Sequence, residues 1–566
     1  MSPVNAVTDL VNRGGPGGSF GRPRARAGVL LGILFLFFFQ MLSDFVGGLY
    51  GLGLRHTSIP PEIVSLGLLL SPLLLGLFPK CFSSRHVLTG LVFCILVARV
   101  LEVPLSPRAQ VWVSGLGVAA FLVFLPALLV QDREAGVLPF GLGLALALSL
   151  SILLRALGAG LDLTAHGGFE VFGWFLAMSA GWLWLQVSPA RVSSTPQAAD
   201  LGRITAWSIG LASALALLYF AFTTPQVIAR WTDTDARLIL AGTVVSLCAW
   251  TFFLAAGSVP SRKSLIAWNM VFVAALVLTI WLNQVGLPKL REAYPVVAPQ
   301  NTLLAEIALV VMVGAFPVTL VDGHLFATAL HRTRPTARMM GGAFSLGGLW
   351  MLALILGQVL TTVYDYVPVV GPCFRDRFWM VFLAAGLGLA LPVLALPKGQ
   401  RALEAGRSKW IMIGVASVGG LALAAALVRV GHPAPVPGPG DRMRVLTYNV
   451  QQGYSADGLR NVEGQLEVIR RQAPDILGLQ ESDTARLSGG NADIVGYLAS
   501  NLRPVCTKRS ENGWGWGARL EGSGIDSPHT YCVYSVIALA QEDPVRAVRL
   551  VLLGLHPVVV DRRLGR

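Results

Sequence analysis

The run GVLLGILFLFFFQMLSDFVGGLY at residues 28–50 decides the class of fold, because Asp44 is its one charged residue. A transmembrane helix needs about 20 mainly apolar residues, so this run can cross a bilayer. Similar runs recur as far as residue 428, and the second of them is the shortest. We expect about thirteen spans, near residues 28–50, 62–78, 86–104, 109–130, 136–157, 168–188, 204–223, 238–257, 264–285, 302–324, 340–362, 378–396 and 410–428.

The composition agrees with a protein that lies mostly in lipid. Of the 566 residues, 54% are hydrophobic and only 13% are charged, whereas about a quarter of the residues of a soluble protein are charged. The formal net charge is +13, but the Lys and Arg side chains lie mainly between the apolar runs. This distribution is typical of membrane orientation, and we do not expect a nucleic-acid partner.

The charge pattern also predicts the domain order and the topology. Residues 1–27 read as a basic cytosolic tail without a cleavage site, and residues 28–429 form the polytopic region. The loops predicted to be cytosolic carry more Lys and Arg than the others. An odd number of spans then places the chain after residue 429 on the lumenal side. Residues 430–441 are a Pro- and Gly-rich linker, and residues 442–566 form a separate C-terminal domain.

Six ionisable residues fall within or beside the apolar runs. Such residues are costly in lipid and usually face a partner or a wet cavity. Asp322 and His324, two residues apart, could form a site, although structural pairing between helices is the favoured interpretation. For Asp44 a functional and a structural role are equally favoured. The six residues are Asp44, Arg99, Glu170, Glu306, Asp322 and His324.

The six cysteines are scattered without CxxC spacing, so zinc is not expected. A disulfide between Cys506 and Cys532 is compatible with a lumenal C-terminal domain.

The C-terminal domain opens with a strand–helix–strand pattern. Residues 445–450 are a short apolar run typical of a buried strand, residues 462–471 show helical amphipathicity, and residues 476–479 begin a second strand. Asn449 lies at the end of the first strand, and Gln480 and Glu481 follow the second. The pattern predicts an α/β unit with polar residues at the strand ends, where such folds bind ligands.

The sequence TYNV at residues 447–450, followed by DILGLQE at residues 475–481, resembles the opening of the endonuclease/exonuclease/phosphatase (deoxyribonuclease I-like) superfamily. The resemblance implies a four-layer α/β fold and phosphodiester chemistry. It further implies that Asn449 and Glu481 are catalytic, with Asn449 positioning the phosphate and both residues at the Mg²⁺ site. A carboxylate with water and phosphate oxygens is the ligand set that Mg²⁺ prefers.

The later part of this domain departs from the superfamily. No Asp-x-Asn and no Ser-Asp-His motif follows, so the Asp–His pair that would act in proton transfer is missing. The C-terminal part is atypical after about residue 501. We therefore expect a partial domain of reduced activity, and the motifs leave open whether the chain is an enzyme.

Together the two halves resemble the membrane proteins of glycosylphosphatidylinositol (GPI) anchor lipid remodelling. This resemblance implies work on a membrane lipid or GPI anchor in the endoplasmic reticulum or Golgi, with membrane proteins of GPI maturation as partners. Three alternatives remain at this stage. One is a membrane-tethered lipid phosphodiesterase of the sphingomyelinase type, and another is a non-catalytic membrane scaffold or transporter. The third, a nuclease, is the weakest, because a lumenal domain seldom meets nucleic acid.

Overall fold

The structure is a computed structural model in which most of the chain up to residue 502 is described. The described residues are 21–53, 61–131, 139–166, 168–186, 200–232, 234–255, 260–283, 302–362, 377–397, 409–428, 445–455, 458, 460–474, 476–480, 482, 485–502, 506–508 and 532–535.

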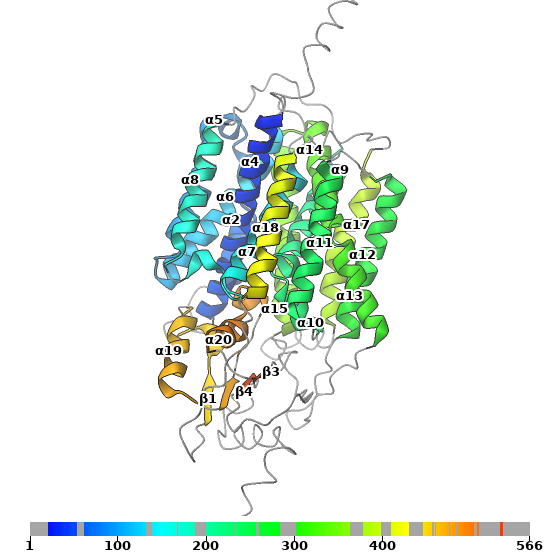
Figure 1. Cartoon of the computed structure of the whole chain (residues 1–566). Coiled ribbons are helices and arrows are strands. Elements are labelled where there is room, and N and C mark those ends of the chain that lie inside the picture. The colour runs from blue at the N-terminus through cyan, green and yellow to red at the C-terminus, as the bar shows by residue number, and fades with distance from the viewer. Residues whose placement is uncertain are drawn as a thin grey trace, which may run out of the picture.

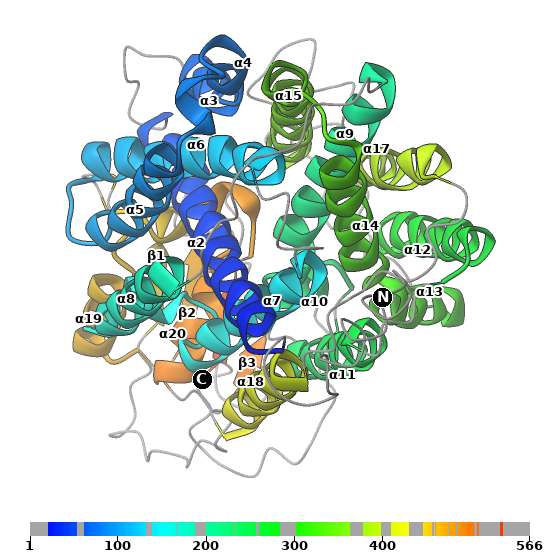
Figure 2. The same cartoon turned by 90° about the horizontal axis from the view of Figure 1, so that it is seen from above.

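Long helices lie side by side and form one bundle (Figure 1). In the view along the helices, α5 and α8 lie on one side and α12 and α13 on the other (Figure 2). The α-helices of the bundle are α2 (Gly21–Gly53), α3 (Pro61–Leu69), α4 (Leu73–Leu77), α5 (Arg85–Leu101), α6 (Pro107–Gln131), α7 (Phe140–Leu157), α8 (Glu170–Gln186), α9 (Leu201–Leu217), α10 (Gln226–Thr232), α11 (Ala236–Ala255), α12 (Arg262–Leu282), α13 (Leu303–Ala315), α14 (Val318–Thr333), α15 (Ala337–Thr362), α17 (Phe378–Ala390) and α18 (Lys409–Val428).

The bundle confirms a multi-pass helical membrane protein. Within the described residues, 10 segments are long and apolar enough to cross a membrane. Helices α5 and α8 have 17 residues each, so they lie at the lower end of spanning length. The predicted second span is instead two short helices, α3 and α4. Pro72 precedes α4 and has no N–H for the helical hydrogen bond that would join them.

Close helix contacts depend on residues without a side chain. A Cβ atom on Gly348 of α15 would lie 2.2 Å from the carbonyl oxygen of Leu69 in α3, and one on Gly341 would lie 2.5 Å from the backbone nitrogen of Gly76. Small residues allow the backbones of membrane helices to approach in this way. Glycine at these positions therefore lets α15 pack directly on α3 and α4.

The C-terminal unit (described residues 445–535) contains one parallel sheet with the strand order β1-β2-β4-β3. Its first three elements lie where the sequence pattern places them, and β1 pairs in parallel with β2. The Asn461 side chain caps α19 by accepting a hydrogen bond from the Gly464 backbone N–H. The elements are β1 (Val445–Asn449), α19 (Val462–Gln472), β2 (Ile476–Gln480), α20 (Ile494–Leu502), β3 (Cys506–Lys508) and β4 (Cys532–Ser535).

The predicted four-layer, deoxyribonuclease I-like domain is not supported. In the described part of the chain this unit is a single sheet with α19 and α20. Cys506 and Cys532 are register partners on β3 and β4, and the disulfide between them stays a prediction.

The C-terminal unit lies at the end of the bundle where α2 ends (Figure 1). The Tyr454 hydroxyl donates a hydrogen bond to the carbonyl oxygen of Gly47 over 2.8 Å. The Gln452 side-chain amide donates to the hydroxyl of Tyr50 over 3.1 Å. Gly47 and Tyr50 belong to the last turns of α2. The unit therefore contacts the C-terminal end of this helix, which begins at Gly21.

Candidate functional site

A loop of the C-terminal unit, Ala485–Asp493, is buried between the unit and the bundle. We call it the interface loop. The Ser43 hydroxyl on α2 donates a hydrogen bond to the Gly490 carbonyl over 2.7 Å. The Asn491 amide donates to the carbonyl oxygen of Tyr219 over 3.0 Å. Tyr219 lies in η3 (Leu218–Phe222), a π-helical turn, and such turns are frequent at functional sites.

The conformation of the interface loop turns its backbone toward the bundle. Ala485, Gly490 and Asn491 have φ of 53°, 62° and 57°, which is the left-handed region that glycine and asparagine tolerate best. Ala485 and Leu487 join the main hydrophobic core of the bundle. The loop is therefore packed into the bundle end, and its backbone carbonyls face polar side chains there.

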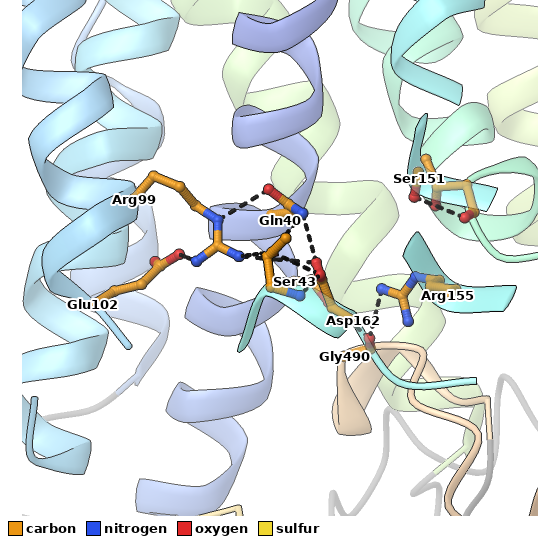
Figure 3. A network of polar contacts seen from close by, with 10 residues as sticks. Gln40, Ser43, Arg99, Glu102, Ser151, Arg155, Asp162 and Gly490 are labelled. Carbon is orange, nitrogen blue, oxygen red and sulfur yellow. Dashed lines mark hydrogen bonds and ion pairs between the residues drawn. The ribbon is translucent and has the colours of Figure 1, made fainter. Parts of the chain in front are cut away.

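Arg99 is the centre of a buried polar network beside this loop (Figure 3). Its guanidinium donates over 2.9 Å to the Gln40 side-chain oxygen, 2.7 Å to Glu102 and 2.6 Å to the Thr164 hydroxyl. Arg99 and Glu102 are 1% and 0% exposed. A buried ion pair requires such additional hydrogen bonds to offset the loss of water, and Arg99 has them.

Asp162, in the connection between α7 and α8, completes the network. Its carboxylate accepts hydrogen bonds from the Gln40 amide over 2.7 Å and from the Thr164 backbone N–H and hydroxyl over 2.9 Å and 2.8 Å. Arg99 lies 4.0 Å away. Burial acts to raise the pKa of Asp162, but the charges of Arg99 and Arg155 and the Thr164 hydrogen bonds together lower it. Asp162 is thus held as a carboxylate.

Two further guanidinium groups bind the interface loop through its backbone. Arg155 of α7 donates to the carbonyls of Asn491 over 3.3 Å and Gly490 over 3.4 Å. Arg460 donates to the carbonyl of Gly489 over 2.5 Å. Within the described residues, neither guanidinium forms an ion pair with a carboxylate. Both positive charges therefore face neutral acceptors.

Asp44 of α2 lies among these groups without a direct partner. Arg99, Arg460 and Arg155 act on it electrostatically, but it has no hydrogen bond or ion pair within the described part of the chain. We call Asp44, Arg99, Glu102, Arg155, Asp162 and Arg460 the charged cluster. Three carboxylates and three guanidiniums make its formal net charge zero.

Four members of the charged cluster line a small polar cavity. Asp44, Asp162, Arg155, Arg460 and His166 line it, and the backbone of the interface loop closes one side. Its volume of about 10 Å³ holds about one water molecule. Asp44 and Arg155 belong to the candidate membrane spans Ala25–Gly51 and Phe140–Leu157. The cavity therefore lies where these two spans meet the C-terminal unit.

His166 makes the stability of the chain depend on pH. Burial and the nearby charge of Arg460 lower the pKa of His166 to about 4. Between about pH 6.5 and 4 the unfolded chain binds a proton that the folded chain does not, so stability falls as the pH falls. We expect a loss of about 1–2 kcal/mol, allowing for the partial exposure of the imidazole. The measurement is thermal unfolding in detergent across this pH range.

The matched variant for this pH dependence is His166→Gln, which cannot titrate. Its melting temperature should change less than that of the parent between pH 6.5 and 4. His86, whose side chain is exposed, provides the control substitution His86→Gln. Equal slopes for the parent and His166→Gln would contradict the assignment.

The structure describes only one of the two residues predicted to perform phosphodiester chemistry. The side-chain oxygen of Asn449 accepts a hydrogen bond from the Gln451 backbone over 2.9 Å. Gln480 is its register partner, and Glu481 lies outside the described residues. No group of three or more His, Cys, Asp or Glu suited to a metal is found in the described part. The Mg²⁺ ligands stay a prediction.

The six membrane candidates divide into three pairs. Asp44 and Arg99 belong to the charged cluster. Glu170 and Glu306 lie in the first turns of α8 and α13, where a negative charge stabilises a helix.

Asp322 and His324 are buried on α14 but do not form a joint site, since residues two apart on a helix do not face each other. The Nδ1 of His324 accepts a hydrogen bond from the Gly141 backbone over 3.4 Å. Both carboxylate oxygens of Asp322 are buried and have no hydrogen-bond partner within the described residues.

No protein-family model matches the chain, and no curated protein matches it. Among solved structures, the chain is similar to the proton:xylose symporter XylE of the major facilitator superfamily, bound to 6-bromo-6-deoxy-D-glucose. The TM-score is 0.47 with 13% sequence identity, and the alignment covers 69% of this chain and 99% of the symporter chain.

The prediction of GPI-anchor remodelling through a phosphodiesterase fold is wrong. In the described residues the C-terminal unit is a single parallel sheet with α19 and α20, and not the four-layer fold on which that prediction depends. The sphingomyelinase-type alternative requires the same unsupported fold. The alternative of a non-catalytic scaffold or transporter agrees better with these findings.

Proposed function

We propose that this chain is a membrane transport protein that carries a small hydrophilic solute. The observation that supports the proposal is the charged cluster around a polar cavity at the end of a lipid-embedded bundle. Ionisable groups inside membrane helices are costly and usually mark a substrate or ion pathway. Arg155 and Asp44 lie in two separate spans, so movement between those spans would change the site.

The proposal also concerns the orientation of the chain. The C-terminal unit contacts the last turns of α2, and the basic tail precedes the first turn. These positions support a topology in which the basic tail and the C-terminal unit lie on opposite sides of the membrane, with the tail in the cytosol. The lumenal placement of the C-terminal unit and the endoplasmic reticulum or Golgi location stay predictions. Protease protection of a C-terminal tag in sealed microsomes tests the lumenal placement.

The test is uptake of radiolabelled solutes into proteoliposomes that contain the full chain. Glycine, succinate and glucose represent a zwitterion, an anion and a neutral solute. We expect saturable uptake of at least one of them above that of protein-free liposomes. Arg155→Gln should reduce this uptake about tenfold or more, because it removes a charged donor from the cavity.

Arg237→Gln is the matched control, since Arg237 pairs with Asp235 at an exposed position. If none of the three solutes enters faster than in protein-free liposomes, the transport proposal fails. The scaffold alternative would then be preferred, because the buried interface loop provides a stable attachment of the C-terminal unit to the bundle.

A further inference from the structure

Three members of the charged cluster lie near one another without forming a direct ion pair. Asp44, Arg155 and Arg460 line the same cavity, yet none of them forms an ion pair within the described residues. Arg155 is buried, Asp44 and Arg460 are partly buried, and a charge that is shielded from water without an ionic partner is unfavourable. Such an arrangement is suited to a ligand that supplies both missing charges.

The geometry points to a binding site for a small zwitterion, an ammonium carboxylate of the amino-acid type. Its ammonium group pairs with Asp44, and its carboxylate binds the guanidinium groups of Arg155 and Arg460. This inference rests on the proposed function and names the class of solute for the same site.

The backbone of the interface loop occupies the place of the ligand carboxylate. Arg155 donates to the carbonyl oxygens of Asn491 and Gly490 over 3.3 Å and 3.4 Å, which are long distances for hydrogen bonds. A carboxylate forms shorter, charge-assisted and bidentate bonds with a guanidinium. Loop and ligand therefore compete for Arg155, and the weaker acceptors belong to the loop.

The remaining polar groups form the wall of the site. Asp162 and Arg99 already hold the Gln40 and Thr164 hydrogen bonds, so they are not available to a ligand without the loss of this network. They make the wall rigid and leave Asp44 as the carboxylate that can receive a cation.

The size of the cavity limits the ligand and requires movement. About one water molecule fits while the interface loop is in place. The apolar residues of the lining are Leu161, Ala165 and Ala492, which offer little surface to a long apolar tail. The ligand is thus a small molecule, and its entry displaces the interface loop.

The test measures binding by the purified full chain in detergent, through the ligand-dependent rise in melting temperature. The probes are glycine, β-alanine and γ-aminobutyrate, which differ in the distance between their charges. Acetate and ethylammonium supply each charge alone. We expect at least one zwitterion to bind about tenfold or more tightly than either single-charge probe. If all three zwitterions bind no better than acetate, the inference is overturned.

Two variants locate the binding. Asp44→Asn keeps the shape of the side chain and should weaken zwitterion binding about tenfold or more, with acetate binding unchanged. Asp200→Asn is the matched control, because Asp200 pairs with Arg203 at an exposed position. Unchanged zwitterion affinity in folded Asp44→Asn would contradict the assignment. If zwitterions bind but no solute is taken up, the binding site is supported and the transport proposal is refuted. If glucose alone is taken up and no zwitterion binds, the zwitterion site is refuted.

Discussion

Replacement of Arg99 by Met should lower the free energy of unfolding by about 3–5 kcal/mol. The substitution leaves Glu102 fully buried without its ion partner, and Glu102 already has one carboxylate oxygen without a hydrogen bond. Gln40 and Thr164 lose a donor as well. Chemical or thermal unfolding of the full chain in one detergent measures the loss.

The size of this effect should depend on Glu102. In the double variant Arg99→Met/Glu102→Leu the stranded Glu102 charge is removed, and Asp162 keeps its hydrogen bonds from Gln40 and Thr164. Apolar replacement of a buried pair is often neutral or stabilising. We expect the double variant to be more stable than Arg99→Met. Arg237→Met is the exposed control, with an expected cost of about 0–1 kcal/mol. Equal costs for Arg99→Met and Arg237→Met would show that the buried network contributes no special stability.

The helical part of the fold could be predicted because each apolar run is a local signal. The run at residues 28–50 agrees with α2, and the run at residues 410–428 agrees with α18. The run at residues 62–78 was predicted as one span because hydropathy does not register the missing N–H of Pro72. The structure has two short helices there. The strand–helix–strand pattern at residues 445–479 is likewise local, and its elements lie where they were expected.

The candidate site could not be predicted because it is formed by distant segments. Asp44 and Arg99 were recognisable as charges in apolar runs. Arg155 and Asp162 lie near the end of α7 and beyond it, where charges are ordinary, so the sequence gives no reason to single them out. Arg460 precedes the predicted amphipathic helix of the C-terminal unit. Only the packing of that unit against the bundle brings these charges together.

Asn449 shows what a resemblance based on a short motif can specify, whereas Glu481 lies outside the described residues. Asn449 follows the strand as expected, but its side chain is engaged in a local turn with Gln451. A motif specifies residue types and spacing. Phosphodiester chemistry also needs further groups around the phosphate, and those depend on later segments that the motif does not include.

A reversible disulfide between α2 and the interface loop should stop transport. A Cβ atom on Gly490 would lie 2.9 Å from the hydroxyl oxygen of Ser43. In a disulfide, each Cβ lies about 3 Å from the sulfur of the other cysteine, so Ser43→Cys/Gly490→Cys has suitable geometry. Because the interface loop must leave Arg155 before a ligand can enter, oxidation of this pair should reduce solute uptake about a hundredfold, and dithiothreitol should restore it.

The single variants Ser43→Cys and Gly490→Cys separate the cross-link from other effects. Gly490 has a φ of 62°, so a cysteine there is strained by roughly 1–2 kcal/mol. Its Cβ atom would also lie 3.0 Å from the Arg460 guanidinium, and the single variant reports both effects without the cross-link. The other cysteines of the chain respond equally to oxidant in all variants. Full uptake by a double variant whose disulfide is verified by mass spectrometry would mean that the loop stays in place during transport. The solute would then have to reach the bundle by a route that avoids Arg155, because the cross-linked loop keeps its carbonyl groups on that guanidinium.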